Sequence, residues 1–185
     1  MGWQKLAGFV YRFRIGWILR QMEVNMKLTH RFALAISLTL LCASLVGAQG
    51  TTFQATLTGK DQNPPIETIA HGTASFTLSD DGSSLNYTIS VVDTADITMA
   101  HIHIAAMGQN GPVATWLCPT KSNAAPKPGK FTGVLATGTI TAADLVGPLQ
   151  GKTIADLVTD IKAGNAYVNI HTTANPSGEI RGQIQ

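Results

Sequence analysis

From Thr51 onward, polar and apolar side chains alternate along short segments that turn residues separate. Successive side chains of a strand point to opposite faces, so this alternation gives each strand one apolar and one polar face. The clearest segments are residues 53–57, 74–78 and 85–91, with an Asp-Asp-Gly hairpin turn at 80–82. The pattern predicts a mainly β chain that folds as an immunoglobulin-like antiparallel β-sandwich or barrel.

Later segments continue the pattern. Glycine and proline indicate turns at residues 108–112 and 175–178, and a long exposed loop at 121–130. Further strands are predicted around His101 and at residues 113–117, 131–140, 166–173 and 179–183.

One segment, residues 153–163, has helical periodicity instead. Thr153 and Asp156 form a capping-box pattern at its start, and Gly164 is a suitable stop. Apolar residues recur at the spacing of one helix face at Ile154, Leu157, Val158 and Ile161. One short helix is therefore predicted near 153–163, closing an end of the sandwich, and a shorter helical turn at 141–145.

Histidines occur at matching positions of two predicted strands. His101 and His103 alternate with two isoleucines, and His171 occupies the polar face of the segment 166–173. If these strands are neighbours, three imidazoles gather on one outward, solvated surface. Three imidazoles suit copper, or zinc as second choice, and leave a coordination position open. His71 has the same outward parity and is a possible fourth ligand.

The alternative is a wet face on which these histidines make ordinary hydrogen bonds. In the last strand, Ile180 is expected to face inward, while Glu179 and Arg181 share the outer surface with His171. Arg181 then has two interpretations: a surface ion pair with Glu179 or a loop carboxylate, or a fixed positive charge that attracts a small anion to an open metal position.

Residues 26–48 have the parts of a secretory signal peptide: basic residues, an apolar run at 32–46, and cleavage expected after Ala48. The remainder, 49–185, is then secreted or periplasmic and keeps no stable membrane anchor. The alternatives are a retained anchor, for which the run is short, and a lipoprotein signal through Cys42.

Residues 1–25 precede this complete signal and are interpreted as a spurious or disordered extension, with an interfacial helix as the alternative. Residues 1–48 carry six of the 13 Lys and Arg and one of the 11 Asp and Glu, which leaves seven basic against ten acidic residues afterwards. That balance does not indicate a nucleic-acid partner. Cys118 is then the one remaining cysteine: a buried thiol, or alternatively an intermolecular disulfide or a metal thiolate.

Three stretches carry a family resemblance that covers residues 53–184. They read FQATLTGKDQNPPIET, AHIHIAAMGQNGPV and AGNAYVNIHTTANPSGEIRGQI. They resemble the CHRD domain, which was first described in chordin and is found in many secreted bacterial proteins. The resemblance implies an immunoglobulin-like β-barrel, distantly similar to copper-zinc superoxide dismutases, whose biochemical role is unsettled. Growth-factor antagonism is not implied, because the chain lacks the cysteine-rich modules of chordin.

The dismutase comparison concerns the histidines. Those enzymes hold copper with a His-x-His strand and a later strand ending in His, followed by an arginine that guides superoxide. The order His101, His103, His171 and Arg181 is similar. The chain departs from that pattern because residues 105–130 contain no histidine for the bridging and zinc ligands, and because Cys118 has no partner for the dismutase disulfide.

The favoured hypothesis is a secreted, non-catalytic binding module whose ligand is a metal ion, an extracellular protein or a polysaccharide, bound at the histidine face. The competing hypothesis is a copper-dependent redox enzyme that uses Arg181 for an anionic substrate. A third is a structural envelope or matrix domain.

Overall fold

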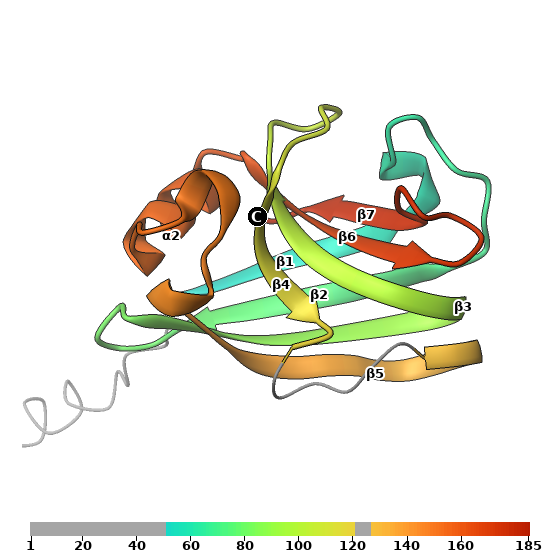
Figure 1. The fold of residues 1–185 in the computed structure, drawn as a ribbon, viewed down its shortest axis with the longest axis horizontal. Coiled ribbons are helices and arrows are strands. Elements are labelled where there is room, and N and C mark those ends of the chain that lie inside the picture. Colours follow the sequence, from blue (N-terminus) through green and yellow to red (C-terminus); the bar gives the residue numbers. More distant parts are fainter. Residues whose placement is uncertain (1–50, 121–126) are drawn as a thin grey trace, which may run out of the picture. The chain divides into compact units, whose positions relative to one another are not determined.

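The computed structural model describes residues 51–120 and 127–185, which form a single β domain (Figure 1). The predicted extension, the predicted signal peptide and Cys42 lie outside the described residues. Among the residues described, no helix has the length and apolar character needed to cross a membrane.

Antiparallel strands build the domain, as the alternation predicts. They are β1 (Thr52–Thr58), β2 (His71–Leu78), β3 (Ser84–Ile104), β4 (Val113–Cys118), β5 (Lys127–Thr141), β6 (Ala166–Thr172) and β7 (Ile180–Gln183). The strand order is β2-β1-β7-β6-β3-β4, β5 pairs with β3, and a further pairing of β2 with β3 closes the sheet into a barrel. The mainly β fold class is confirmed.

The long strand β3 departs from the sequence prediction, which placed two separate strands in this region. Its first half pairs with β2 and β5, and its last residues pair with β6 and β4. Asp93 and Asp96 have φ of 50° and 51°, and the register with β5 shifts around both. Bulges of this kind bend a strand without ending it, so one chain segment serves both sides of the barrel.

Strand β5 differs from the prediction at its start, whereas the predicted helical segments are present. Strand β5 begins at Lys127, so the predicted exposed loop 121–130 is wrong for its last four residues. The predicted helix is confirmed as α2 (Ile154–Lys162), with the Thr153–Asp156 capping box, at one end of the barrel (Figure 1). The shorter predicted turn is the 3-10 helix η3 (Ala142–Asp144). Two more such turns are η2 (Gly59–Asp61) and η4 (Gly147–Leu149).

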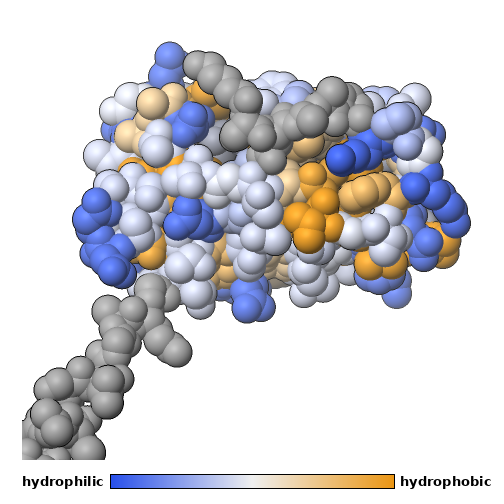
Figure 2. Space-filling model, turned by 90° about the horizontal axis from the view of Figure 1, so that it is seen from below, coloured by the Kyte–Doolittle hydropathy of each residue, from blue (hydrophilic) through white to orange (hydrophobic). Residues whose placement is uncertain are grey.

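The apolar faces of the strands meet inside the barrel. Leu57, Ile89 and Ile102 are fully buried there, and Cys118 is 1% exposed, which confirms the prediction of a buried thiol. On the face shown in Figure 2, polar and apolar residues are mixed. The large apolar side chains that remain exposed come from different elements: Ile69, Met107, Trp116 and Val134. Scattered exposure of this kind is ordinary for a globular domain.

Candidate metal centre

Three histidines converge where β3 and β6 lie side by side. His101 and His103 come from β3, and His171 comes from β6. One potential ligand atom from each residue lies within 4.8 Å of those from the other two. The ring centroids of His101 and His171 are 5.1 Å apart, and those of His101 and His103 are 5.6 Å apart. The predicted gathering of three imidazoles is therefore present.

The expectation that this face is solvated is wrong. His101 is 3% exposed, His103 is 8% exposed and His171 is 7% exposed. Every residue of β6 is buried, so both faces of this strand are covered. Alternation identifies the two faces of a strand, but a strand in the middle of a barrel can have both of them covered by other segments.

Backbone segments that follow each histidine strand provide this cover. His103 Nδ1 lies 2.9 Å from the carbonyl oxygen of Gly111, and His171 Nδ1 lies 2.9 Å from that of Pro176. Trp116 on β4 contacts the third ring edge-on, with its centroid 4.2 Å from that of His101. The turn residues at 108–112 and 175–178 thus return over the imidazoles.

These hydrogen bonds assign the tautomers of two rings. A carbonyl oxygen only accepts, so Nδ1 of His103 and of His171 each donates its proton, and each Nε2 keeps a lone pair. The Nε2 of His171 lies 3.3 Å from Nδ1 of His101, which must then donate. Such second contacts to backbone carbonyls orient the histidine ligands of metal sites.

Two ring nitrogens have no hydrogen-bond partner within the described parts of the chain. They are the Nε2 atoms of His101 and His103, and both are buried. A buried polar atom left without a partner costs about 1–3 kcal/mol. A metal ion at the cluster would give such lone pairs a partner.

Burial keeps the imidazoles neutral. It is the largest cause that lowers the pKa of His101 to about 3, followed by the charges of His171 and His103. The pKa of His103 and that of His171 are also lowered, mainly by burial, although the bonds to Gly111 and Pro176 oppose this. Metal ions bind the unprotonated imidazole, so the cluster is in the form a metal requires.

Arg181 is buried at 2% exposure, against the expectation that it shares an outer surface with His171. Its Cζ lies 3.4 Å from the ring centroid of Tyr167, a cation–π contact. The same Tyr167 ring is stacked on His103, with centroids 4.9 Å apart and planes 8° apart. Because β6 lies between β3 and β7, the tyrosine separates the guanidinium from the imidazole.

The expected Arg181–Glu179 surface ion pair is wrong as well. Glu179 is 8% exposed and accepts hydrogen bonds from the hydroxyls of Thr68 and Thr172, both at 2.7 Å. Arg181 donates instead to the carbonyl oxygen of Gln109 at 2.7 Å and to Oδ1 of Asn110 at 3.1 Å. The arginine therefore holds the loop 105–112 in place.

Arg181 also borders a pocket of about 570 Å³. Several amide side chains line it: Gln54, Gln62, Gln183 and Gln185. Amides donate and accept hydrogen bonds, so this pocket can bind a polar ligand.

His71 is not brought to the cluster. It lies at the start of β2, where it is exposed, and its Nδ1 is 3.0 Å from the carbonyl oxygen of Ile69. Its cross-strand partners are Thr58 and Val92. The same outward parity did not place it near the other histidines, because β2 pairs with the first half of β3 and the cluster is on the last residues of that strand.

Comparison with known proteins gives one family. The family model described as CHRD domain matches residues 53–184. No curated protein matches the chain. The match covers the described strands apart from Thr52, the first residue of β1, and it includes the three clustered histidines.

Proposed function

The chain belongs to the CHRD domain family, and on this premise we propose that it is a binding module in which His101, His103 and His171 hold a metal ion. The observation that carries the proposal is the convergence of three buried, neutral imidazoles, two of which keep an Nε2 atom without a partner. A domain that needed only stability would gain from apolar residues here.

Copper is the proposed ion, and zinc is the second choice. Imidazole nitrogen suits both ions, and copper binds a given nitrogen site more tightly. Zinc in structural sites is held by four protein ligands. The group found in the described residues contains three His and no carboxylate or thiolate.

The redox-enzyme alternative gains no support from Arg181. Its guanidinium lies on the Tyr167 ring and is bonded to the loop 105–112, so the tyrosine stands between it and His103. We therefore propose binding without catalysis. Secretion through residues 26–48 stays a prediction, as does a protein or polysaccharide partner, for which the pocket beside Arg181 is a candidate location.

Calorimetric titration of the purified protein with Cu(II) and Zn(II) tests the proposal. We expect one copper ion per chain, and no binding in the triple variant His101→Ala/His103→Ala/His171→Ala. His71→Ala is the matched control, because it removes an exposed histidine outside the cluster. Circular dichroism of each variant checks the fold. Equal copper binding by the wild-type protein and the triple variant, or no binding by the wild type, would overturn the proposal.

A further inference from the structure

The histidine cluster has a sulfur-containing neighbour on β3. Met99 lies two residues before His101 on β3 and therefore has the same side-chain parity. It is also the direct cross-strand partner of His171. We infer that Met99 is a fourth ligand of this centre, a thioether that binds copper as Cu(I); this inference rests on the proposed function.

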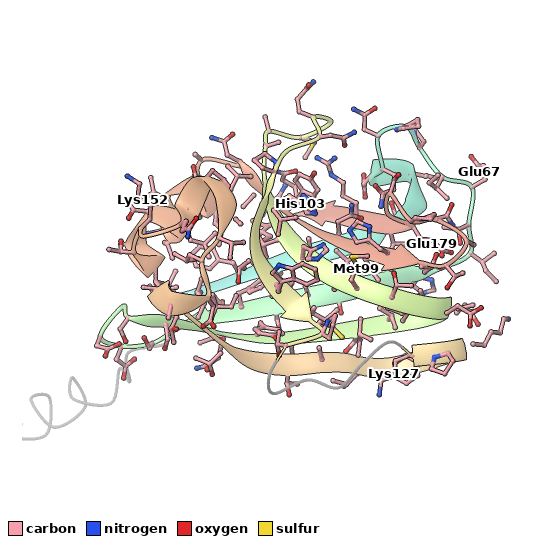
Figure 3. All side chains as sticks on the ribbon, viewed as in Figure 1. Glu67, Met99, His103, Lys127, Lys152 and Glu179 are labelled. Carbon is pink, nitrogen blue, oxygen red and sulfur yellow. The ribbon has the colours of Figure 1, made fainter. Side chains whose placement is uncertain are left out.

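The strand register places Met99 within reach. Between residues 99 and 104, β3 pairs with β6 without a shift, so Met99 opposes His171 and His101 opposes Asn169. Cβ atoms of directly opposite residues are about 4.5–5.5 Å apart. The sulfur lies two bonds beyond Cβ. Met99 and His103, both on β3, are labelled in Figure 3.

Asn169 and Tyr167, which lie on the same face of β6 as His171, already have hydrogen-bond partners. Oδ1 of Asn169 accepts a hydrogen bond from Gln62 at 2.7 Å, and its amide nitrogen donates to the carbonyl oxygen of Ser177. Tyr167 is stacked on His103, and its hydroxyl accepts from the backbone of Gly111 at 3.1 Å. Met99 is half-buried at the border of the cluster and needs no hydrogen bond.

Cys118, the described thiol near the cluster, is on the wrong face. It is the register partner of Ala100, whereas His101 pairs with Trp116. Residues that oppose each other in an antiparallel pair share a face, so the thiol points with Ala100 into the barrel. The metal-thiolate interpretation of Cys118 is therefore not supported, and Met99 supplies the soft donor.

The chemistry of the donor set then selects the ion. Three imidazoles alone can hold either Cu(II) or Zn(II), whereas a thioether is a soft donor that favours Cu(I). A centre of three imidazoles and one thioether should therefore discriminate Cu(I) from Zn(II) more strongly than the imidazoles alone.

The variant Met99→Leu tests this inference, because leucine keeps the volume and removes the sulfur. Met107→Leu is the matched control: the same change in a residue that is 68% exposed. Cu(I) affinity is measured without oxygen by competition with a colorimetric Cu(I) chelator, and Zn(II) affinity by calorimetry. We expect Met99→Leu to lower Cu(I) affinity about tenfold or more and to leave Zn(II) affinity within about twofold, while Met107→Leu changes neither.

X-ray absorption at the copper edge gives a second readout, in which a sulfur scatterer should be present in the wild type and absent from Met99→Leu. An unchanged Cu(I) affinity, or an equal loss of Cu(I) and Zn(II) affinity as expected for a packing residue, would overturn the role of Met99. In both cases the triple histidine variant still tests the proposed function separately, since that proposal fails only if the wild type binds no metal at the cluster.

Discussion

Both faces of the β3–β6 pair are buried, but one carries aliphatic side chains and the other carries imidazoles. On one face, Ile102 and its partner Val168 are fully buried among aliphatic side chains. On the other, His101 and His103 are almost as buried, yet their Nε2 atoms have no partner in the described chain. Burial stabilises the first face through its apolar area and penalises the second, whose polar atoms it deprives of water. The imidazole face is thus maintained at a cost in stability.

The largest expected effect on stability comes from substituting adjacent residues of β3 that lie on opposite faces. Ile102→Ala should lower the free energy of unfolding by about 2–5 kcal/mol, because it leaves a cavity in the core. His101→Leu should change the unfolding free energy of the metal-free protein by only about 1 kcal/mol, because it replaces a poorly satisfied polar ring with an apolar group. Urea denaturation in the presence of a chelator measures both.

Val134→Ala is a matched control on a residue that is 56% exposed, where a change within about 0.5 kcal/mol is expected. If His101→Leu cost as much as Ile102→Ala, the histidine would be a packing residue, and the contrast between the two faces would be lost.

The strand alternation predicted which residues share a face, for both the aliphatic and the imidazole face of the β3–β6 pair. It also predicted Ile180 as inward, and that residue is fully buried. The Thr153–Asp156 capping box predicted α2 because both of its hydrogen bonds are local. Local patterns were sufficient where the structure depends on residues a few positions apart.

The burial of the imidazole face could not be predicted in the same way. It depends on the carbonyls of Gly111 and Pro176, which reach His103 and His171 only after two loops have folded over the barrel. The asparagine, glycine and proline residues of those loops indicated turns but not their direction. The bend of β3 at Asp93 and Asp96 was not visible in the apolar pattern either. His71 is remote from the cluster because β2 pairs with the part of β3 that precedes this bend.

The pH dependence of stability is the second way to test the contrast. In the unfolded chain a histidine has a pKa near 6.5, whereas the folded state holds the pKa of His101 at about 3. The unfolded state therefore binds more protons between these values, and the stability of the metal-free protein should fall as the pH drops below about 6.5. Between pH 7 and 5.5 we expect a loss of about 1–3 kcal/mol.

Urea denaturation at several pH values, again with a chelator, measures this loss. In the triple histidine variant the slope should be much smaller, because the groups that take up protons on unfolding are gone. A wild-type stability that stayed constant from pH 7 to 5.5 would show that the imidazoles are hydrated or already paired with a charge.

The smallest expected effect concerns the contact that joins the imidazole face to its covering loop. The hydroxyl of Tyr167 accepts a hydrogen bond from the backbone N–H of Gly111, the residue whose carbonyl orients His103. Tyr167→Phe should lower the free energy of unfolding by about 1 kcal/mol and weaken copper binding by less than about tenfold. Chelator competition measures the second effect.

Tyr87→Phe is the matched control for this last change. The Tyr87 hydroxyl donates to the carbonyl oxygen of Leu117 at 2.7 Å, and Tyr87 belongs to the first half of β3. Both variants lose a hydrogen bond of a tyrosine hydroxyl to the backbone, so losses of stability of the same order are expected. Only Tyr167→Phe should weaken copper binding, because only Tyr167 holds a residue that orients a ligand. Equal copper affinity in the two variants would mean that the loop covers the centre without orienting His103.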